Sequence, residues 1–167
     1  MDVSIPAGIG ITPYACMLNS LKYYNPNDIH RLKTLNKMYL IWVCRGLKDF
    51  NWMTKLMFDV EERLKAHGRP DFLECILYVT QGYKANQTDD ELVSDQANDI
   101  GKWMKQKLRG GRPKFKEVLT DIGLNYHATR IGVFFCGPPA LGHMLEEECR
   151  SLRVQDNQYL MHKESFG

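Results

Sequence analysis

The sequence predicts an α/β fold with a Rossmann-like, parallel sheet of five strands, in the spatial order 3-2-1-4-5, flanked by helices. Three observations predict it. Short β-rich runs alternate with helix-like stretches, the pattern of parallel strands joined by crossover helices. Residues 38–44 form a continuous apolar run, typical of a strand buried on both faces. Glycine and proline follow β-prone stretches at residues 7–13 and 133–139, where a strand would turn into a helix.

Each strand is predicted from a short β-prone run bounded by turn residues. The five predicted strands are residues 3–6, 38–44, 72–80, 130–136 and 158–162. The first is very short, and the fourth leads into the second Gly-Pro turn. Because the parallel strands end at one edge of the sheet, the two turns are expected to face each other there and to hold one dinucleotide.

The helices are predicted from apolar residues at helical spacing and from residues that favour helix ends. They span residues 13–24, 49–66, 96–108, 114–122 and 139–150. Thr12 is the expected N-cap of the first, with Pro13 at the first helical position. Residues 81–95 are polar and aperiodic, which predicts a long mobile loop.

Size and composition predict one domain over residues 1–167. The chain is 44% apolar and has no run long enough for a membrane helix or a signal peptide, so it is expected to be soluble. A net charge of +2, from 22 basic and 20 acidic residues, argues against a nucleic-acid partner. Five cysteines without paired spacing favour a reducing, cytosolic environment, and the histidines show no spacing for a metal site.

The glycine-rich turn is a candidate phosphate site. Gly8 and Gly10 permit close backbone approach, and the amides that open the next helix lack intrahelical partners. A pyrophosphate could bind them. A plain structural turn is the alternative, and Thr12 could contact the ligand, cap the helix or do both.

Two arginines are candidates for recognising a 2′-phosphate. Arg45 follows the second strand, where NAD-binding domains commonly carry an acidic residue for the ribose. A guanidinium there can bind phosphate bidentately, which favours NADPH over NADH. Arg112, in a Gly-Arg-Pro break, is the second candidate. A solvent-facing arginine is the alternative for Arg45.

The second turn places Cys136, Gly137 and Pro138 at the end of a central strand. No nearby basic residue favours a thiolate, so Cys136 is expected to pack beside nicotinamide rather than to act as a nucleophile. An inert buried thiol is the alternative. Gly137 and Pro138 shape the turn.

Six segments, in this order, carry a resemblance to a known family. They are Ala-Gly-Ile-Gly-Ile-Thr-Pro at 7–13, Ile-Trp-Val-Cys-Arg at 41–45, Leu-Tyr-Val-Thr at 77–80, Gly-Arg-Pro at 111–113, Ile-Gly-Val-Phe-Phe-Cys-Gly-Pro at 131–138 and His-Lys-Glu-Ser-Phe at 162–166. Together they resemble the C-terminal NADPH-binding lobe of the NADPH oxidases, within the ferredoxin–NADP reductase superfamily. The Trp-Val-Cys-Arg run and the Glu-Ser-Phe ending are most like the type-four branch.

The resemblance implies the residues of a nucleotide site. Gly8, Ile9, Gly10, Thr12 and Pro13 would hold the diphosphate. Arg45 and Arg112 would hold the 2′-phosphate of NADPH, and Cys136, Gly137 and Pro138 would lie beside the nicotinamide. Thr12, Cys136 and Phe166 would be the residues nearest the chemistry. Phe166 matches a terminal aromatic that stacks on flavin, although Gly167 beyond it departs from the usual ending.

The resemblance also implies a larger protein, in which NADPH gives hydride to FAD and haems pass electrons to dioxygen, producing superoxide or hydrogen peroxide. The FAD-binding and transmembrane parts are expected to be missing here, so this chain would bind NADPH without turning over. It would lie on the cytosolic face of the plasma membrane or endoplasmic reticulum. Its partners would be the FAD and membrane haem domains and a small membrane subunit.

Two alternatives remain open. The same lobe could serve a ferric or flavin reductase, against which the ending at Phe166 and the Trp-Val-Cys-Arg run argue. A non-catalytic interaction module is the other, with residues 81–95 and the basic residues between Lys102 and Lys116 as docking surfaces. The basic residues could equally form a solvated helix face.

Overall fold

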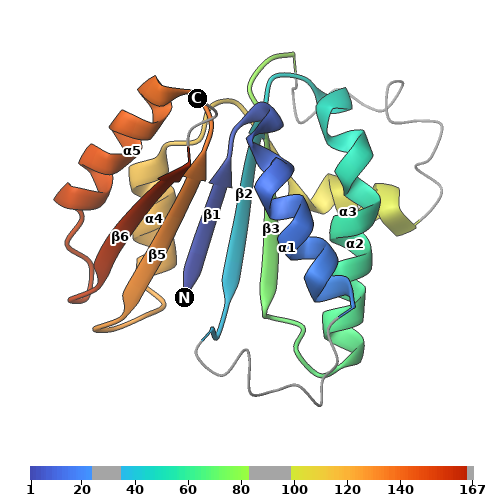
Figure 1. Cartoon of the computed structure of the whole chain (residues 1–167), viewed down its shortest axis with the longest axis horizontal. Helices are drawn as coiled ribbons and strands as arrows, with labels where there is room; N and C mark the ends of the chain where they lie inside the picture. The colour runs from blue at the N-terminus through green and yellow to red at the C-terminus, as the bar shows by residue number, and fades with distance from the viewer. Residues whose placement is uncertain (24–34, 83–98, 165–167) are drawn as a thin grey trace.

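A six-stranded, all-parallel sheet forms the centre of the molecule. The computed structural model describes residues 1–23, 35–82 and 99–164. The strand order is β4-β3-β2-β1-β5-β6 (Figure 1). The strands are β1 (Asp2–Pro6), β2 (Met38–Cys44), β3 (Leu73–Val79), β4 (Leu108–Gly110), β5 (Arg130–Cys136) and β6 (Gln158–Glu164). The order reverses between β1 and β5, so the topological switch point lies at their carboxyl ends.

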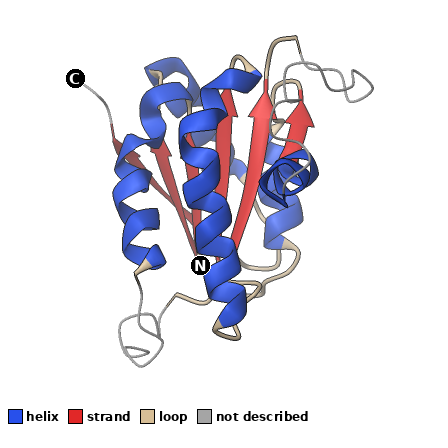
Figure 2. Ribbon diagram, turned by 90° about the vertical axis from the view of Figure 1, so that its right-hand side faces the viewer, coloured by secondary structure: helices blue, strands red, loops and turns tan. Residues whose placement is uncertain are grey.

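Helices cover both faces of the sheet (Figure 2). They are α1 (Thr12–Lys22), α2 (Asn51–Ala66), α3 (Asp99–Lys107), α4 (Phe115–Gly123) and α5 (Pro139–Ser151). Strand β2 separates two apolar cores, as its unbroken apolar run predicts. Leu40 and Trp42 pack in the core beneath α1, α2 and α3, whereas Tyr39 and Ile41 pack in the core beneath α4 and α5.

The α/β fold and the order of the five predicted strands are confirmed, but the strand count was wrong. The sixth strand, β4, pairs with the edge strand β3 through Leu77 and Leu108. It is only 3 residues long, and of its residues only Leu108 is buried. A segment so short, with arginine and glycine, has no alternating pattern, so the sequence predicts residue 108 as the end of the preceding helix.

Two helix starts also differ from prediction. The glycine turn forms a 3-10 helix, η1 (Gly8–Ile11), which runs directly into α1. Thr12 therefore has helical torsions, and Ile11 rather than Thr12 occupies the N-cap position. The Thr12 hydroxyl donates to the carbonyl oxygen of Ile9 at 2.7 Å instead of accepting from a backbone amide. Likewise, a 3-10 turn η3 (Leu47–Phe50) precedes α2.

Several predictions concern segments outside the described residues. The polar loop at residues 81–95 is described only at its first two positions, and Phe166 and Gly167 are not described. Within the described ranges, no helix combines the length and apolarity needed to cross a bilayer.

Candidate dinucleotide site

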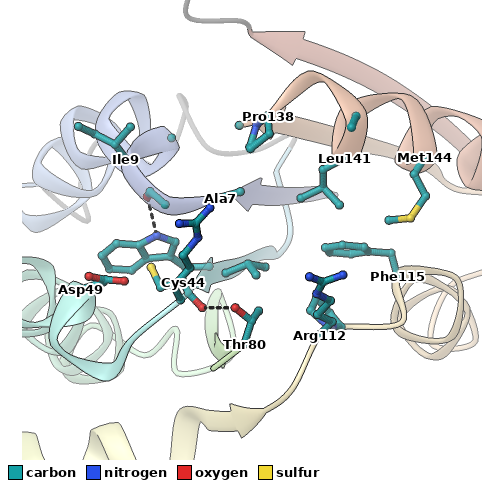
Figure 3. A pocket seen from close by; sticks show the side chains of 18 of the residues that line it. Ala7, Ile9, Cys44, Asp49, Thr80, Arg112, Phe115, Pro138, Leu141 and Met144 are labelled. Atoms are coloured by element: carbon teal, nitrogen blue, oxygen red, sulfur yellow. Dashed lines mark hydrogen bonds between the residues drawn. The ribbon is translucent and has the colours of Figure 1, made fainter. Parts of the chain in front are cut away.

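A cavity of about 1280 Å³ opens at the carboxyl edge of the sheet (Figure 3). It is larger than the roughly 300–1,000 Å³ of typical small-molecule sites. The residues that line it follow five different strands, and they include Ala7–Gly10 after β1, Cys44 and Arg45 at the end of β2, Thr80 after β3, Arg112 after β4 and Gly137 after β5. An extended ligand lying in this crevice would therefore contact loops on both sides of the switch point.

The loops after β1 and β5 are in direct contact. The amide of Ala7 donates to the carbonyl oxygen of Cys136 at 2.9 Å. A Cβ on Gly10 would lie 2.0 Å from that same oxygen, so only glycine fits at position 10. Gly8 has a left-handed φ of +57° and open space where its Cβ would be. The turn thus requires one glycine for packing and another for its torsion angles.

Trp42 anchors the glycine turn through a hydrogen bond. Its indole N–H donates to the carbonyl oxygen of Gly8 at 2.9 Å. The ring is 1% exposed and packs edge-to-face on Phe50 and on Trp52, with ring centroids 4.9 and 6.1 Å away. The floor of the cavity is therefore a rigid aromatic cluster bonded to the turn.

Replacing Trp42 by phenylalanine should test this link. Trp42→Phe removes the bond to Gly8 and part of a buried ring, so we expect the free energy of unfolding to fall by about 1–3 kcal/mol. Urea unfolding followed by circular dichroism measures the change. The control Trp52→Phe alters a side chain that is 57% exposed and should change stability by about 0.5 kcal/mol or less. Equal effects of the two variants would contradict the assigned link.

Three basic side chains line the cavity. Arg45, Lys48 and Arg112 are lining residues, and both arginines are exposed. Neither guanidinium pairs with an acidic side chain in the described part of the chain. Among the described lining residues, Asp49 alone is acidic, and it accepts a hydrogen bond from the amide of Gly46 at 3.0 Å. This donor set suits an anionic ligand, and guanidinium groups match phosphate geometry.

The predicted site residues do not all reach the cavity. Gly8, Ile9, Gly10, Arg45, Arg112, Gly137 and Pro138 line it. Thr12 and Pro13 lie in the first turn of α1 behind the glycine turn and are not lining residues. Cys136 is not a lining residue either, because its side chain is 1% exposed and packs in the core on the α1 side of the sheet. Phe166 lies outside the described residues.

Two thiols near the site are kept protonated. Burial, with a smaller effect from Glu164, raises the pKa of Cys136. Burial, with a smaller effect from Asp49, raises the pKa of Cys44 to about 12. Both groups are therefore neutral near pH 7, which suits packing and opposes nucleophilic chemistry.

Thiol labelling should report this burial. Only Cys16 is exposed among the five free cysteines. We expect a disulfide reagent such as DTNB to modify one thiol quickly in the native chain and all five in guanidinium chloride. Fast native labelling of two or more thiols would contradict the packing described here.

Among the apolar lining residues that sequence reasoning missed, three lie together. Phe115 begins α4, and Leu141 and Met144 lie on α5. Figure 3 shows the three side chains together on the Arg112 side of the cavity. The only available signal was their position, since Phe115 closely follows Arg112 and Leu141 follows Pro138. They form an apolar wall against which a planar ring can pack.

Residues 3–150 match the family model described as the ferric reductase NAD binding domain. A match over this length defines an NAD-binding domain of the reductase type. The chain belongs to the ferric reductase NAD-binding domain family.

Its curated relatives include NADPH oxidases, so the resemblance inferred from the sequence is confirmed. NADPH oxidase 3 of Homo sapiens is 34% identical over 168 residues, covering 98% of this chain and 29% of that protein. NADPH oxidase 1 of Rattus norvegicus is 35% identical over 168 residues, covering 98% of this chain and 30% of that protein. NADPH oxidase 4 of Pongo abelii is 27% identical over 169 residues, covering 100% of this chain and 27% of that protein.

These identities correct one detail, because types one and three are more similar to this chain than type four is. The chain also spans less than a third of these relatives' length.

Among solved structures, the flavohemoglobin from Malassezia yamatoensis matches with a TM-score of 0.50 at 20% identity, covering 99% of this chain and 31% of that chain. That likeness shows the fold alone.

Proposed function

We propose that this chain is the NADPH-binding domain of an NADPH oxidase. The observation that carries the proposal is the cavity at the switch point. It is lined by the glycine turn, which contacts the β5 loop, and by two guanidinium groups that have no acidic partner among the described residues. Its position and its donor set suit a phosphorylated dinucleotide. The names of the similar proteins NADPH oxidase 3 and NADPH oxidase 1 state that their nucleotide is NADPH.

Each part of the cavity then has a role in binding. Arg45 and Arg112 bind the 2′-phosphate, which distinguishes NADPH from NADH. The diphosphate lies along Gly8, Ile9 and Gly10. Thr12 and Pro13 do not contact it but support the glycine turn, Thr12 through its hydrogen bond to the carbonyl oxygen of Ile9. Gly137 and Pro138 contact the nicotinamide half. Cys136 packs behind them and fixes the separation of the two loops through its carbonyl oxygen.

In the whole protein, NADPH would supply a hydride, and the FAD and haem domains would carry the electrons to dioxygen, which would yield superoxide or hydrogen peroxide. This chain's residues bind and orient the nucleotide, and the neutral Cys136 thiol packs in the core behind the β5 loop. Phe166 would cover the flavin until nicotinamide arrives. The domain would lie on the cytosolic side of a membrane, against the FAD and haem domains, with a small membrane subunit as a further partner.

A ferric reductase is the second candidate. The description of the matching family model favours it, because that model is named for ferric reductases. The two candidates share the nucleotide site and differ in the electron acceptor. They are separated by assaying the complete protein for oxygen consumption and for reduction of a ferric chelate.

Calorimetric titration tests the nucleotide proposal on the chain itself. We expect one saturable site for NADPH and affinity for NADH that is lower by about tenfold or more, since hydrogen bonds to a charged group contribute about 1.5–3 kcal/mol. Absence of saturable binding, or equal affinity for both nucleotides, would instead support a non-catalytic interaction module.

A further inference from the structure

Glu61 joins three elements of the fold with one carboxylate. It lies on α2, and its Oε2 accepts from the indole N–H of Trp103 on α3 at 2.7 Å. Its Oε1 accepts from the amide of Cys75 in β3 at 3.2 Å and pairs with the ammonium group of Lys107 at 3.0 Å. The Glu61 side chain is 15% exposed. Both carboxylate oxygens are therefore satisfied inside the structure, as a half-buried charge requires.

The carboxylate lies where the sheet edge is incomplete. Strand β4 pairs with β3 only from Leu77 to Val79. The amide of Cys75 lies before that segment, so no β4 residue accepts from it, and Glu61 does so instead. An unpaired edge amide in a buried position is costly, which explains why an acidic side chain is directed at it.

The same contact lies directly before the start of β4. Lys107 is the last residue of α3, and Leu108, the first residue of β4, follows it directly. After β4, the amide of Gly111 donates to the carbonyl oxygen of Val79 at 2.8 Å, with φ at +88°. Arg112 comes next and lines the cavity. Between the Glu61 ion pair and Arg112, the backbone is thus held by the pairing of β4 with β3 and by the Gly111 hydrogen bond.

We propose that Glu61 is a positioning residue for nucleotide selectivity. By holding Lys107 and Trp103 against α2 and β3, it fixes the start of β4 and hence the place from which Arg112 reaches the 2′-phosphate. The inference rests on the proposed function, since it assigns Arg112 to that phosphate. Without the carboxylate, α3 keeps its apolar contacts, among them Phe58 against Trp103 at 6.1 Å between ring centroids, but loses the ion pair that sets its end.

The test is Glu61→Gln in the 167-residue chain, with NADPH and NADH titrated separately. Glutamine keeps the shape and one acceptor oxygen but removes the charge that holds Lys107. We expect about three- to tenfold weaker NADPH binding and unchanged NADH binding. Glu62→Gln is the matched control, because Glu62 is exposed and its one ion pair within the described ranges is with Lys65 of the same helix, at 3.6 Å. Both affinities should stay at the wild-type values.

A double variant shows whether the effect passes through Arg112. In an Arg112→Ala background, Glu61→Gln should cause no further loss of NADPH affinity, because coupled positions are not additive. Equal weakening of both nucleotides, or a full additive loss in the double variant, would overturn the inference. If Glu61→Gln does not fold, Lys107→Met is the alternative variant, because it leaves the N–H bonds from Trp103 and Cys75 to Glu61 in place. It should cause the same selective loss of NADPH affinity, and an unchanged selectivity would overturn the inference.

Failure of the wild-type chain to prefer NADPH would instead refute the proposed function.

Discussion

Arg45→Ala should abolish most of the preference of this chain for NADPH over NADH. Arg45 follows β2 at the cavity, is exposed, and has no acidic partner within the described ranges. Its guanidinium is thus available to bind a 2′-phosphate with two parallel hydrogen bonds. Losing them should weaken NADPH binding by about 10- to 100-fold, from the roughly 1.5–3 kcal/mol of hydrogen bonds to charged groups.

NADH has no 2′-phosphate, so its affinity should be unchanged in Arg45→Ala. Calorimetry with both nucleotides measures the ratio directly. Arg153→Ala is the matched control, because Arg153 donates to the carbonyl oxygens of Arg150 and Leu152 and is not a lining residue. A ratio that stays at the wild-type value in Arg45→Ala would refute the role assigned to Arg45.

Gly10→Ala should both destabilise the fold and remove nucleotide binding. The added Cβ would lie 2.0 Å from the carbonyl oxygen of Cys136 and 2.7 Å from its carbonyl carbon. Backbone atoms of a central strand cannot move aside cheaply, so we expect a loss of about 3 kcal/mol or more in the free energy of unfolding. The melting temperature should fall by roughly 10 °C for a chain of this size.

Gly46→Ala is the control for this substitution. Its φ is −117°, and the nearest atom to an added Cβ is a carboxylate oxygen of Asp49 at 3.9 Å. We expect a change below about 1 kcal/mol there. If Gly10→Ala melted at the wild-type temperature and still bound NADPH, the close contact between the two loops would be wrong.

Strands with a strong apolar pattern could be predicted from the sequence to the residue. The bounds of β2 and β5 agree with prediction because both strands lie centrally and their apolar runs end at turn residues. Strand β4 could not be predicted, since its existence depends on pairing with β3 rather than on its own residues. The N-cap at Thr12 failed for a related reason, because the 3-10 turn before it had no sequence signal.

The site residues also divide into those that the sequence predicts and those that it does not. Glycine turns and arginines after strands have a chemical signature, and seven of the predicted residues line the cavity. The apolar wall of Phe115, Leu141 and Met144 has none, because such residues resemble ordinary core. Glu61 looks like part of a solvated helix face in the sequence, and only its three partners in the fold distinguish it.

The central claim is that one NADPH spans the loops after β1 and β5 with its 2′-phosphate on the arginine side. Amide chemical-shift changes of the labelled chain on titration with NADPH test it most directly. The largest changes should fall at Gly8, Ile9, Gly10, Arg45, Arg112 and Gly137, with none at Asn157 beside the amino end of β6. Shifts confined to the amino edge of the sheet, or none at all with excess NADPH, would contradict it.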